Sequence, residues 1–303
     1  MMDNTPLHHI ETLRAAGFWP DEEKLNSERW LTNFDEDDIA AARVLLRSFI
    51  FVSDKVVDAL LIDAYISLLG HIKTNECKPP NDETLQFRKS NFVFTFPTGE
   101  IPHCTDSGYS FVRKVRQLFG VDEQHIMEPS DALNCLLQYS EEQIADTDLV
   151  LVDDFVGTGH QLSKTLKRLY KTPVGQCSIH HLANSLGLRV HYCVLAVTSE
   201  AKKKIRHEHR YLSLHCPHIL GDRYSVRSPN TALVPQGMRN AVKGLIEKYS
   251  ERYMRSDSIP DYVHKYGYCD LGLTIAFQHS VPDATLPIFW AQTDDWHPLY
   301  RRS

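Results

Sequence analysis

Residues 148–159 read DLVLVDDFVGTG, and this stretch decides the fold. Its continuous apolar run, Leu149–Val152, is typical of a strand that is buried on both faces of a parallel sheet. The run ends in two adjacent carboxylates, Asp153 and Asp154, and a short glycine-bearing segment, 155–159, follows them. Glycine tolerates positive φ and lets main-chain N–H groups come close to a ligand. The stretch therefore predicts a buried strand, a binding loop and the start of a helix.

The same alternation of strand and helix continues on both sides. Residues 92–96 (FVFTF) and 190–197 (VHYCVLAV) predict two further strands, and residues 271–277 predict a late one. The helices predicted from apolar periodicity and capping residues are 108–119 after Ser107, 161–170, a basic helix 200–207 after Ser199, and 235–254. This alternation predicts an α/β fold with a parallel sheet flanked by helices.

The amino-terminal part predicts a helical segment with a structural role. Residues 35–38 are acidic, and the positive end of a helix favours negative charge there. Apolar residues then follow at helical spacing as far as Val52, and a second apolar stripe predicts a helix over residues 54–72.

A polar connector, residues 75–82 (NECKPPND), contains two prolines and predicts a domain boundary. The predicted organisation is a helical segment over residues 1–75 and an α/β domain over residues 76–303. The second part ends in an aromatic tail, residues 287–302, whose rings are predicted to cover apolar surface or to form a wall on which a base stacks.

Composition and charge exclude several classes of protein. The formal net charge of −6 argues against a generally basic nucleic-acid coat, although it allows a local basic patch. The most apolar stretch, residues 44–72, contains five charged side chains and predicts no membrane span. The amino terminus lacks a secretory signal pattern, and seven cysteines without a C-x-x-C pair suit reduced thiols. We therefore expect a soluble, cytoplasmic protein without membrane partners.

The residues around the glycine loop predict a particular ligand chemistry. Main-chain N–H groups of residues 155–159, with the positive end of the next helix, can cradle a phosphate. The carboxylates of Asp153 and Asp154 would repel that phosphate, so their partners are hydroxyls or a divalent cation. A phosphate beside a vicinal diol describes a phosphorylated ribose.

This stretch resembles the phosphoribosyl-diphosphate (PRPP) signature of type I phosphoribosyltransferases: a hydrophobic strand, two acids, two hydrophobic residues, a small residue and Thr-Gly. The resemblance implies that Asp153 and Asp154 hold the ribose 2′- and 3′-hydroxyls. It also implies that PRPP or a ribonucleotide binds with Mg²⁺ and reacts at the ribose C1′. The residues that the resemblance assigns to the 5-phosphate are Phe155, Val156, Gly157, Thr158 and Gly159.

Two further features bear on this resemblance. After Thr-Gly the family usually continues with a small hydroxyl pair, whereas this chain has His160-Gln161, which bears on catalytic competence rather than on the fold. In the resembled fold, the loop after the first strand meets the diphosphate. Here Ser107, Gly108 and Tyr109 could supply donors for it, and a plain helix cap explains the same residues.

Looser motifs resemble one divergent branch of phosphoribosyltransferase-like proteins. They are WLTNF at 30–34, GEIP at 99–102 and the segment 286–299. That branch occurs in bacterial conflict systems and includes effectors of some retrons. It implies an antiphage toxin held silent by protein partners, for which a reverse transcriptase with its nucleic acid is one candidate. The alternative is a non-catalytic module of the same fold that senses a nucleotide or binds a partner.

Three other patterns carry competing interpretations. A Walker B-type magnesium site at Asp153 lacks its partner, because no G-x-x-x-x-G-K-[ST] motif occurs in the chain. The histidines in 207–209 and 215–218 suggest a zinc site, although they lack the usual spacing of close pairs. The basic run 202–210 is either a solvated helix face or a contact for nucleic acid or an acidic protein.

Overall fold

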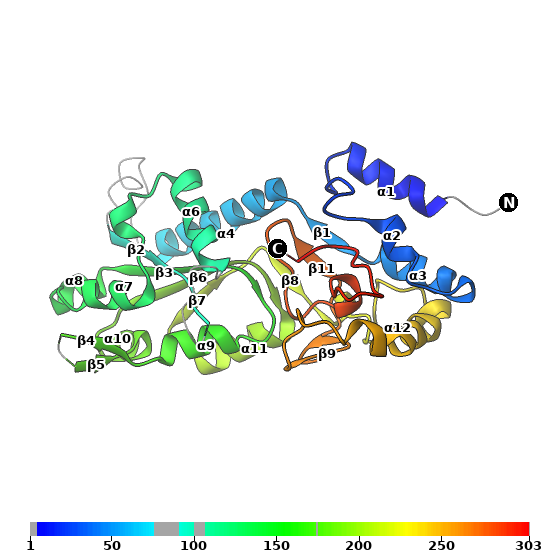
Figure 1. Ribbon diagram of the computed structural model, residues 1–303. Coiled ribbons are helices and arrows are strands. Elements are labelled where there is room, and N and C mark those ends of the chain that lie inside the picture. Colours follow the sequence, from blue (N-terminus) through cyan, green and yellow to red (C-terminus); the bar gives the residue numbers. More distant parts are fainter. Residues whose placement is uncertain (1–4, 76–90, 100–106, 174, 303) are drawn as a thin grey trace. The chain divides into compact units, whose positions relative to one another are not determined.

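The computed structural model describes residues 5–75, 91–99, 107–173 and 175–302, and Figure 1 shows its elements. The chain forms two compact units. Unit 1 combines the residues up to 57 with those from 220 onward, and unit 2 contains residues 58–219.

Unit 2 is built on a parallel sheet. Its strands lie in the order β2, β3, β6 and β7, and β8 also pairs with β6. The register places Leu149 of β3 beside Val93 of β2 and beside Val190 of β6. The predicted α/β fold with a parallel sheet is therefore confirmed. The bounds of these strands are β2 Phe92–Thr95, β3 Asp148–Val156, β6 Arg189–Thr198, β7 Leu212–His215 and β8 His218–Leu220.

Helices cover both faces of this sheet (Figure 1). One face packs against apolar residues of α7, α9, α10 and α11, and α4 and α6 lie on the other. Residues 149–152 of β3 are all buried, as the uninterrupted apolar run predicts. The helices and the β4–β5 hairpin of this unit are α4 Asp54–Asn75, α6 Ser107–Phe119, α7 Pro129–Leu136, α8 Glu141–Ala145, α9 His160–Lys167, α10 Ile179–Ser185, α11 Ser199–Glu208, β4 Tyr170–Thr172 and β5 Gly175–Cys177.

Unit 1 joins the two ends of the chain around an aromatic core. Trp30 stacks on Phe289 with ring centroids 5.5 Å apart, and its indole N–H donates to the carbonyl of Ile288 at 2.8 Å. Trp290 and Trp296 are fully buried, so the prediction that the tail covers apolar surface is confirmed and their faces offer no stacking wall. The elements of this unit are α1 Thr5–Ala15, α2 Ser27–Leu31, α3 Ile39–Arg47, β1 Ile50–Val52, α12 Arg239–Tyr253, β9 Val263–His264, β10 Gly267–Tyr268 and β11 Ile275–Phe277.

Several predicted boundaries differ from the structure. Helical spacing to Val52 is wrong beyond α3, because residues 50–52 form β1 and pair in parallel with β11. Thr198 rather than Ser199 caps α11: its backbone is extended and its hydroxyl accepts the N–H of Ala201 at 3.0 Å. The late strand begins at Ile275 rather than at 271.

The predicted division at residues 75 and 76 differs from the observed division into units. Most of α4 belongs to unit 2, because it packs on the sheet there: Tyr65 stacks on Phe119 of α6 at 4.0 Å, and Cys193 of β6 contacts the carbonyl of Ala64. The sequence after residue 219 returns to the amino-terminal elements, which a linear reading of the chain does not predict.

No helix in the described ranges is both long enough and apolar enough to cross a membrane.

Gly267 provides a test of unit 1. Its φ is +80°, and a Cβ there would lie 2.5 Å from the carbonyl oxygen of Ala284. We expect Gly267→Ala to lower the free energy of unfolding by about 2–4 kcal/mol, because positive φ and a main-chain clash act together. Urea unfolding measures the change. The control is Gly244→Ala in α12, where a Cβ meets nothing within 4 Å and where a gain of about 0.5–1 kcal/mol is expected. Equal effects at the two glycines would contradict the packing described.

Candidate functional site

The glycine loop lies where β3 meets α9. The strand continues to Val156, so Phe155 and Val156, which were predicted to belong to the loop, lie in β3, and the turn itself is Gly157–Gly159. Gly159 caps α9 with φ +72°, and no side chain caps that helix. The start of α9 thus has the main-chain N–H groups that a phosphate cradle requires, and that of His160 makes one long contact, 3.4 Å, with Thr158 Oγ1.

Asp153 is held inside the sheet by its neighbours. The hydroxyl of Tyr192 on β6 donates to Asp153 Oδ2 at 2.7 Å, and the N–H of Asp154 donates to Oδ1 at 3.0 Å. Burial, and next the charge of Asp154, raises the pKa of Asp153 well above its usual value, while the hydroxyl of Tyr192 opposes this. Asp153 is thus a buried carboxyl that takes up a proton readily.

Asp154 is also buried and lies within β3, next to Asp153. Its Oδ1 accepts the N–H of Phe155 at 2.8 Å, which fixes the side chain against the backbone that leads into the turn. The charge of Asp154 and its side-chain hydrogen bond both raise the pKa of Asp153, after the effect of burial. A pair of carboxyls that shares a proton can both accept from and donate to a pair of hydroxyls.

Two threonines brace the turn. The N–H of His160 approaches Thr158 Oγ1 at 3.4 Å, and the hydroxyl of Thr198 donates to the carbonyl of Gly157 at 2.5 Å. The same Thr198 hydroxyl caps α11. Thr158 is buried. Thr198 belongs to the site but was not predicted, because the sequence analysis assigned the cap of α11 to Ser199.

The segment after β2 is tied to the helix that follows the loop. The N–H of Thr98 donates to Thr165 Oγ1 at 3.0 Å, and Arg168 donates to Thr98 Oγ1 at 2.7 Å and to the carbonyl of Gly99. The carboxyl ends of β2 and β3 therefore share one edge of the sheet. Thr165 and Arg168 were not predicted, because only the fold brings residues 98 and 165 together.

The predicted diphosphate residues lie at the start of α6. Ser107, Gly108 and Tyr109 form its first turn, and α6 packs against β3. Gly108 is buried, and a Cβ there would lie 2.5 Å from the side chain of Phe96. Packing against Phe96 thus explains the glycine. Residues 100–106, the rest of the predicted loop, lie outside the described residues.

His160, which departs from the usual signature, is the exposed first residue of α9. Partial burial, and next the charge of Lys204, lowers the pKa of His160. A neutral imidazole at this position adds no positive charge to the phosphate cradle, so any such charge comes from the main chain and the neighbouring lysines.

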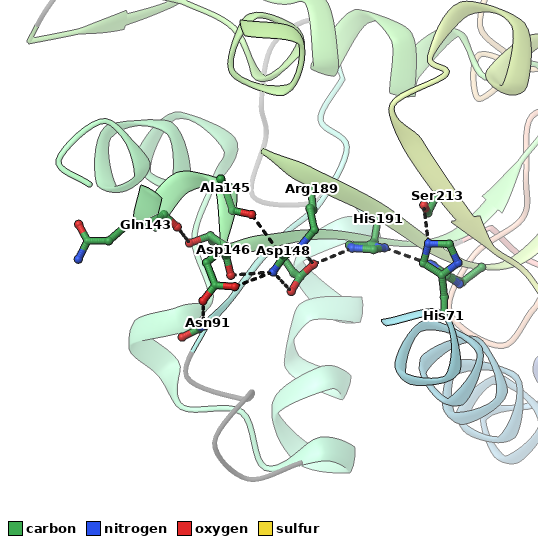
Figure 2. A network of polar contacts seen from close by, with 11 residues as sticks. His71, Asn91, Gln143, Ala145, Asp146, Asp148, Arg189, His191 and Ser213 are labelled. Atoms are coloured by element: carbon green, nitrogen blue, oxygen red, sulfur yellow. Dashed lines mark hydrogen bonds and ion pairs between the residues drawn. The ribbon is translucent and has the colours of Figure 1, made fainter. Parts of the chain in front are cut away.

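A second polar cluster lies at the opposite, amino-terminal edge of the sheet (Figure 2). Arg189 donates to both oxygens of Asp148 at 2.8 and 2.9 Å, and His191 Nε2 lies 2.9 Å from Asp148 Oδ1. His215 links the ring of His191 at 3.2 Å to the hydroxyl of Ser67 at 3.3 Å. This edge borders a cavity of about 420 Å³.

The histidines in 207–209 and 215–218 do not form the zinc site that the sequence suggested. His215 is tied to His191 and Ser67, while His209 is tied to Ser163 at 2.8 Å and to Tyr211 at 3.1 Å. Among the described residues, no group of three or more His, Cys, Asp or Glu side chains is arranged to hold a metal ion. Burial, and next the positive charge that His191 can carry, lowers the pKa of His215 to about 3.

That pKa predicts a pH-dependent contribution to stability. The unfolded pKa of 6.5 exceeds the folded value, so the stabilising contribution of neutral His215 is complete above pH 6.5 and declines as the pH falls towards 3. We expect the difference in unfolding free energy between the wild type and His215→Gln to shrink by about 2 kcal/mol between pH 7.5 and 5.0.

Urea unfolding at the two pH values measures this difference, in which the effect of Asp153 cancels. His207→Gln, which removes a histidine from an exposed position, serves as the control. A pH-independent difference for His215→Gln would contradict the buried neutral histidine.

Comparison with known proteins places this architecture in a family. Residues 27–302 match the model of the PRTase-CE family, a phosphoribosyltransferase-type family, and the chain belongs to it. No curated protein matches the chain. Among solved structures, six chains match; one is the AQ2163 protein from Aquifex aeolicus, with 10% identity, a TM-score of 0.31, and coverage of 64% of this chain and 82% of that one.

Proposed function

We propose that unit 2 binds PRPP or a ribonucleotide at the carboxyl edge of its sheet and acts at the ribose C1′. One observation carries the proposal: two adjacent buried carboxyls, Asp153 and Asp154, lie near the end of β3, two residues before the Gly157–Gly159 turn that opens α9. Membership of a phosphoribosyltransferase-type family supports it.

Different groups at this edge would bind different parts of the ligand. The N–H groups from Gly157 into α9 would bind the 5-phosphate, with the hydroxyl of Thr158 beside them. Asp153 and Asp154 would hold the ribose 2′- and 3′-hydroxyls, as acceptors and, when one proton is shared, as a donor. The bond from Tyr192 to Asp153 fixes the direction of that carboxyl in advance.

The reaction would be a displacement at C1′. The bond from C1′ to the leaving diphosphate or base breaks, that group keeps the electron pair, and the acceptor nucleophile forms the new bond to C1′. The positive charge that develops on the sugar would be stabilised by the nearby carboxylates. The first turn of α6, Ser107–Tyr109, would receive the diphosphate. Carboxylate oxygens suit Mg²⁺, and with two carboxylates at this edge the ion would share its coordination with the diphosphate, whose charge it neutralises.

A biological role follows from the resemblance to conflict-system proteins. We propose that the activity is toxic to the host cell, that it serves antiphage defence of the retron type, and that protein partners hold it silent until infection. Its target would be a cellular nucleotide or a macromolecule.

A non-catalytic nucleotide sensor is the second candidate, and a specific observation favours it. Asp153 is already bonded to Tyr192 and to the backbone, and His160-Gln161 replaces the usual hydroxyl pair. Such a site can bind a ribose without the strong charge that a transition state requires.

Calorimetric titration with PRPP, ATP and NAD in the presence of Mg²⁺ tests the binding. We expect the double variant Asp153→Asn, Asp154→Asn to weaken binding at least tenfold, because hydrogen bonds to charged groups contribute about 1.5–3 kcal/mol each. Asparagine keeps an acceptor for Tyr192, so the fold is retained. The matched control is Asp122→Asn with Asp131→Asn, two exposed positions of the same unit.

Mass spectrometry of the nucleotides after incubation separates the two candidates. Consumption by the wild type that is lost in the double variant supports the transferase-like enzyme. Binding without turnover favours the sensor, and a wild type that binds none of the three ligands would sink the proposal.

A further inference from the structure

The helices α9 and α11 lie side by side on one face of the sheet (Figure 1). The hydroxyl of Ser163 on α9 donates to Glu208 Oε2 on α11 at 3.2 Å, and Lys167 Nζ lies 3.5 Å from the same oxygen. Leu166 of α9 and Ile205 of α11 are buried in the core beneath. The outer sides of the two helices therefore form one continuous surface, which we call the α9–α11 surface.

This surface is cationic in an acidic protein. The two helices contain six Lys and Arg residues and two Glu residues, a net charge of +4, whereas the whole chain carries −6. Within the described part of the chain, Lys203 and Arg206 are exposed and make no ion pair. The six cations are Lys164, Lys167, Lys202, Lys203, Lys204 and Arg206.

Lysines on each of the two helices affect the pKa of a side chain on the other. Although burial opposes it, Ser163 and the charges of Lys204 and Lys167 lower the pKa of Glu208. Lys204 of α11 likewise contributes to the lowered pKa of His160 on α9, after burial. Lysines of one helix thus act on side chains of the other.

We propose that the α9–α11 surface binds the sugar–phosphate backbone of a nucleic acid without reading its bases. The ten residues of α11 span about 15 Å at 1.5 Å per residue, a length that covers about four phosphates of one strand at 3.4 Å spacing. Neither helix contains Phe, Tyr or Trp, so the surface offers phosphate contacts and none of the large aromatic rings on which bases stack best.

The composition of the surface argues against a protein partner. Protein interfaces have a buried centre enriched in aromatic and apolar side chains. The exposed residues of α9 and α11 are all polar, and one of them is acidic: His160, Gln161, Lys164, Lys167, Glu200, Lys203, Arg206 and His207. A polyanion without apolar anchors fits such a surface best.

The α9–α11 surface lies next to the proposed ribose site. Because α9 begins directly after Gly159, a nucleic-acid strand bound to the α9–α11 surface would lie beside the proposed phosphate loop. The binding itself does not depend on the proposed ribose chemistry, so each can fail without the other.

Fluorescence anisotropy of labelled 20-nucleotide single-stranded RNA, single-stranded DNA and duplex DNA of mixed sequence tests the proposal on the full chain. We expect binding that weakens with NaCl from 50 to 200 mM. In Lys203→Glu, Lys204→Glu, Arg206→Glu we expect at least tenfold weaker binding, and for single strands a salt slope shallower by about 2, since each phosphate contact contributes about 0.7.

The matched control reverses three exposed cations of unit 1: Lys55→Glu, Lys243→Glu and Arg255→Glu. It changes the net charge by the same amount and should bind nearly as the wild type does. Thermal unfolding verifies that both triple variants fold. Asp153→Asn with Asp154→Asn should also bind nucleic acid normally, even if it loses the ribose ligand.

Three results would overturn the proposal. They are the absence of salt-dependent binding by the wild type, equal weakening in the two triple variants, and displacement of the oligonucleotide by polyglutamate as effectively, per charge, as by unlabelled nucleic acid. The last result would assign the surface to an acidic protein.

Discussion

The hydrogen bond from Tyr192 to Asp153 joins β3 and β6 inside the buried sheet of unit 2. Burying a carboxyl without a hydrogen-bond partner costs free energy. The β3–β6 register that brings Tyr192 to Asp153 is therefore the one in which this carboxyl has a partner. The turn at Gly157 is fixed from the same neighbourhood, because Thr198 at the end of β6 holds its carbonyl. The geometry of the candidate site thus depends on the β3–β6 pairing, not on the loop alone.

The two edges of the sheet use polar groups differently. At the amino-terminal edge, Asp148 is balanced by Arg189 and His191, and although burial opposes it, these partners lower its pKa (Figure 2). At the carboxyl edge, burial and a neighbouring acid raise the pKa of Asp153 instead. The first arrangement is paired within the protein, which suits a structural role. The second lacks a cation among the contacts described for Asp153, and the arrival of a polyhydroxyl ligand or a metal ion would relieve it.

The charged side chains are distributed unevenly over the protein. A chain of net charge −6 concentrates cations on α9 and α11, next to a turn whose main-chain N–H groups favour an anion. Fields of this kind act over about a Debye length and guide charged ligands towards a site. The same helices bury Leu166 and Ile205 beneath the charges, so one amphipathic pattern serves both the core and the surface.

The sequence by itself determined the strand–turn–helix unit at 148–167 and the parallel class of the sheet, since local apolar runs and glycine spacing specify both. It also located Asp153, Asp154 and the turn, whose role in ligand binding remains a prediction. Only the tertiary structure decided that residues 220–302 return to the amino-terminal elements, that β1 pairs with β11, and that Tyr192, Thr165 and Thr198 support the site. The reason is physical: these contacts join residues dozens to hundreds of positions apart, and packing selects them, whereas no local propensity of Ile50 or Tyr192 specifies a partner so distant in the chain.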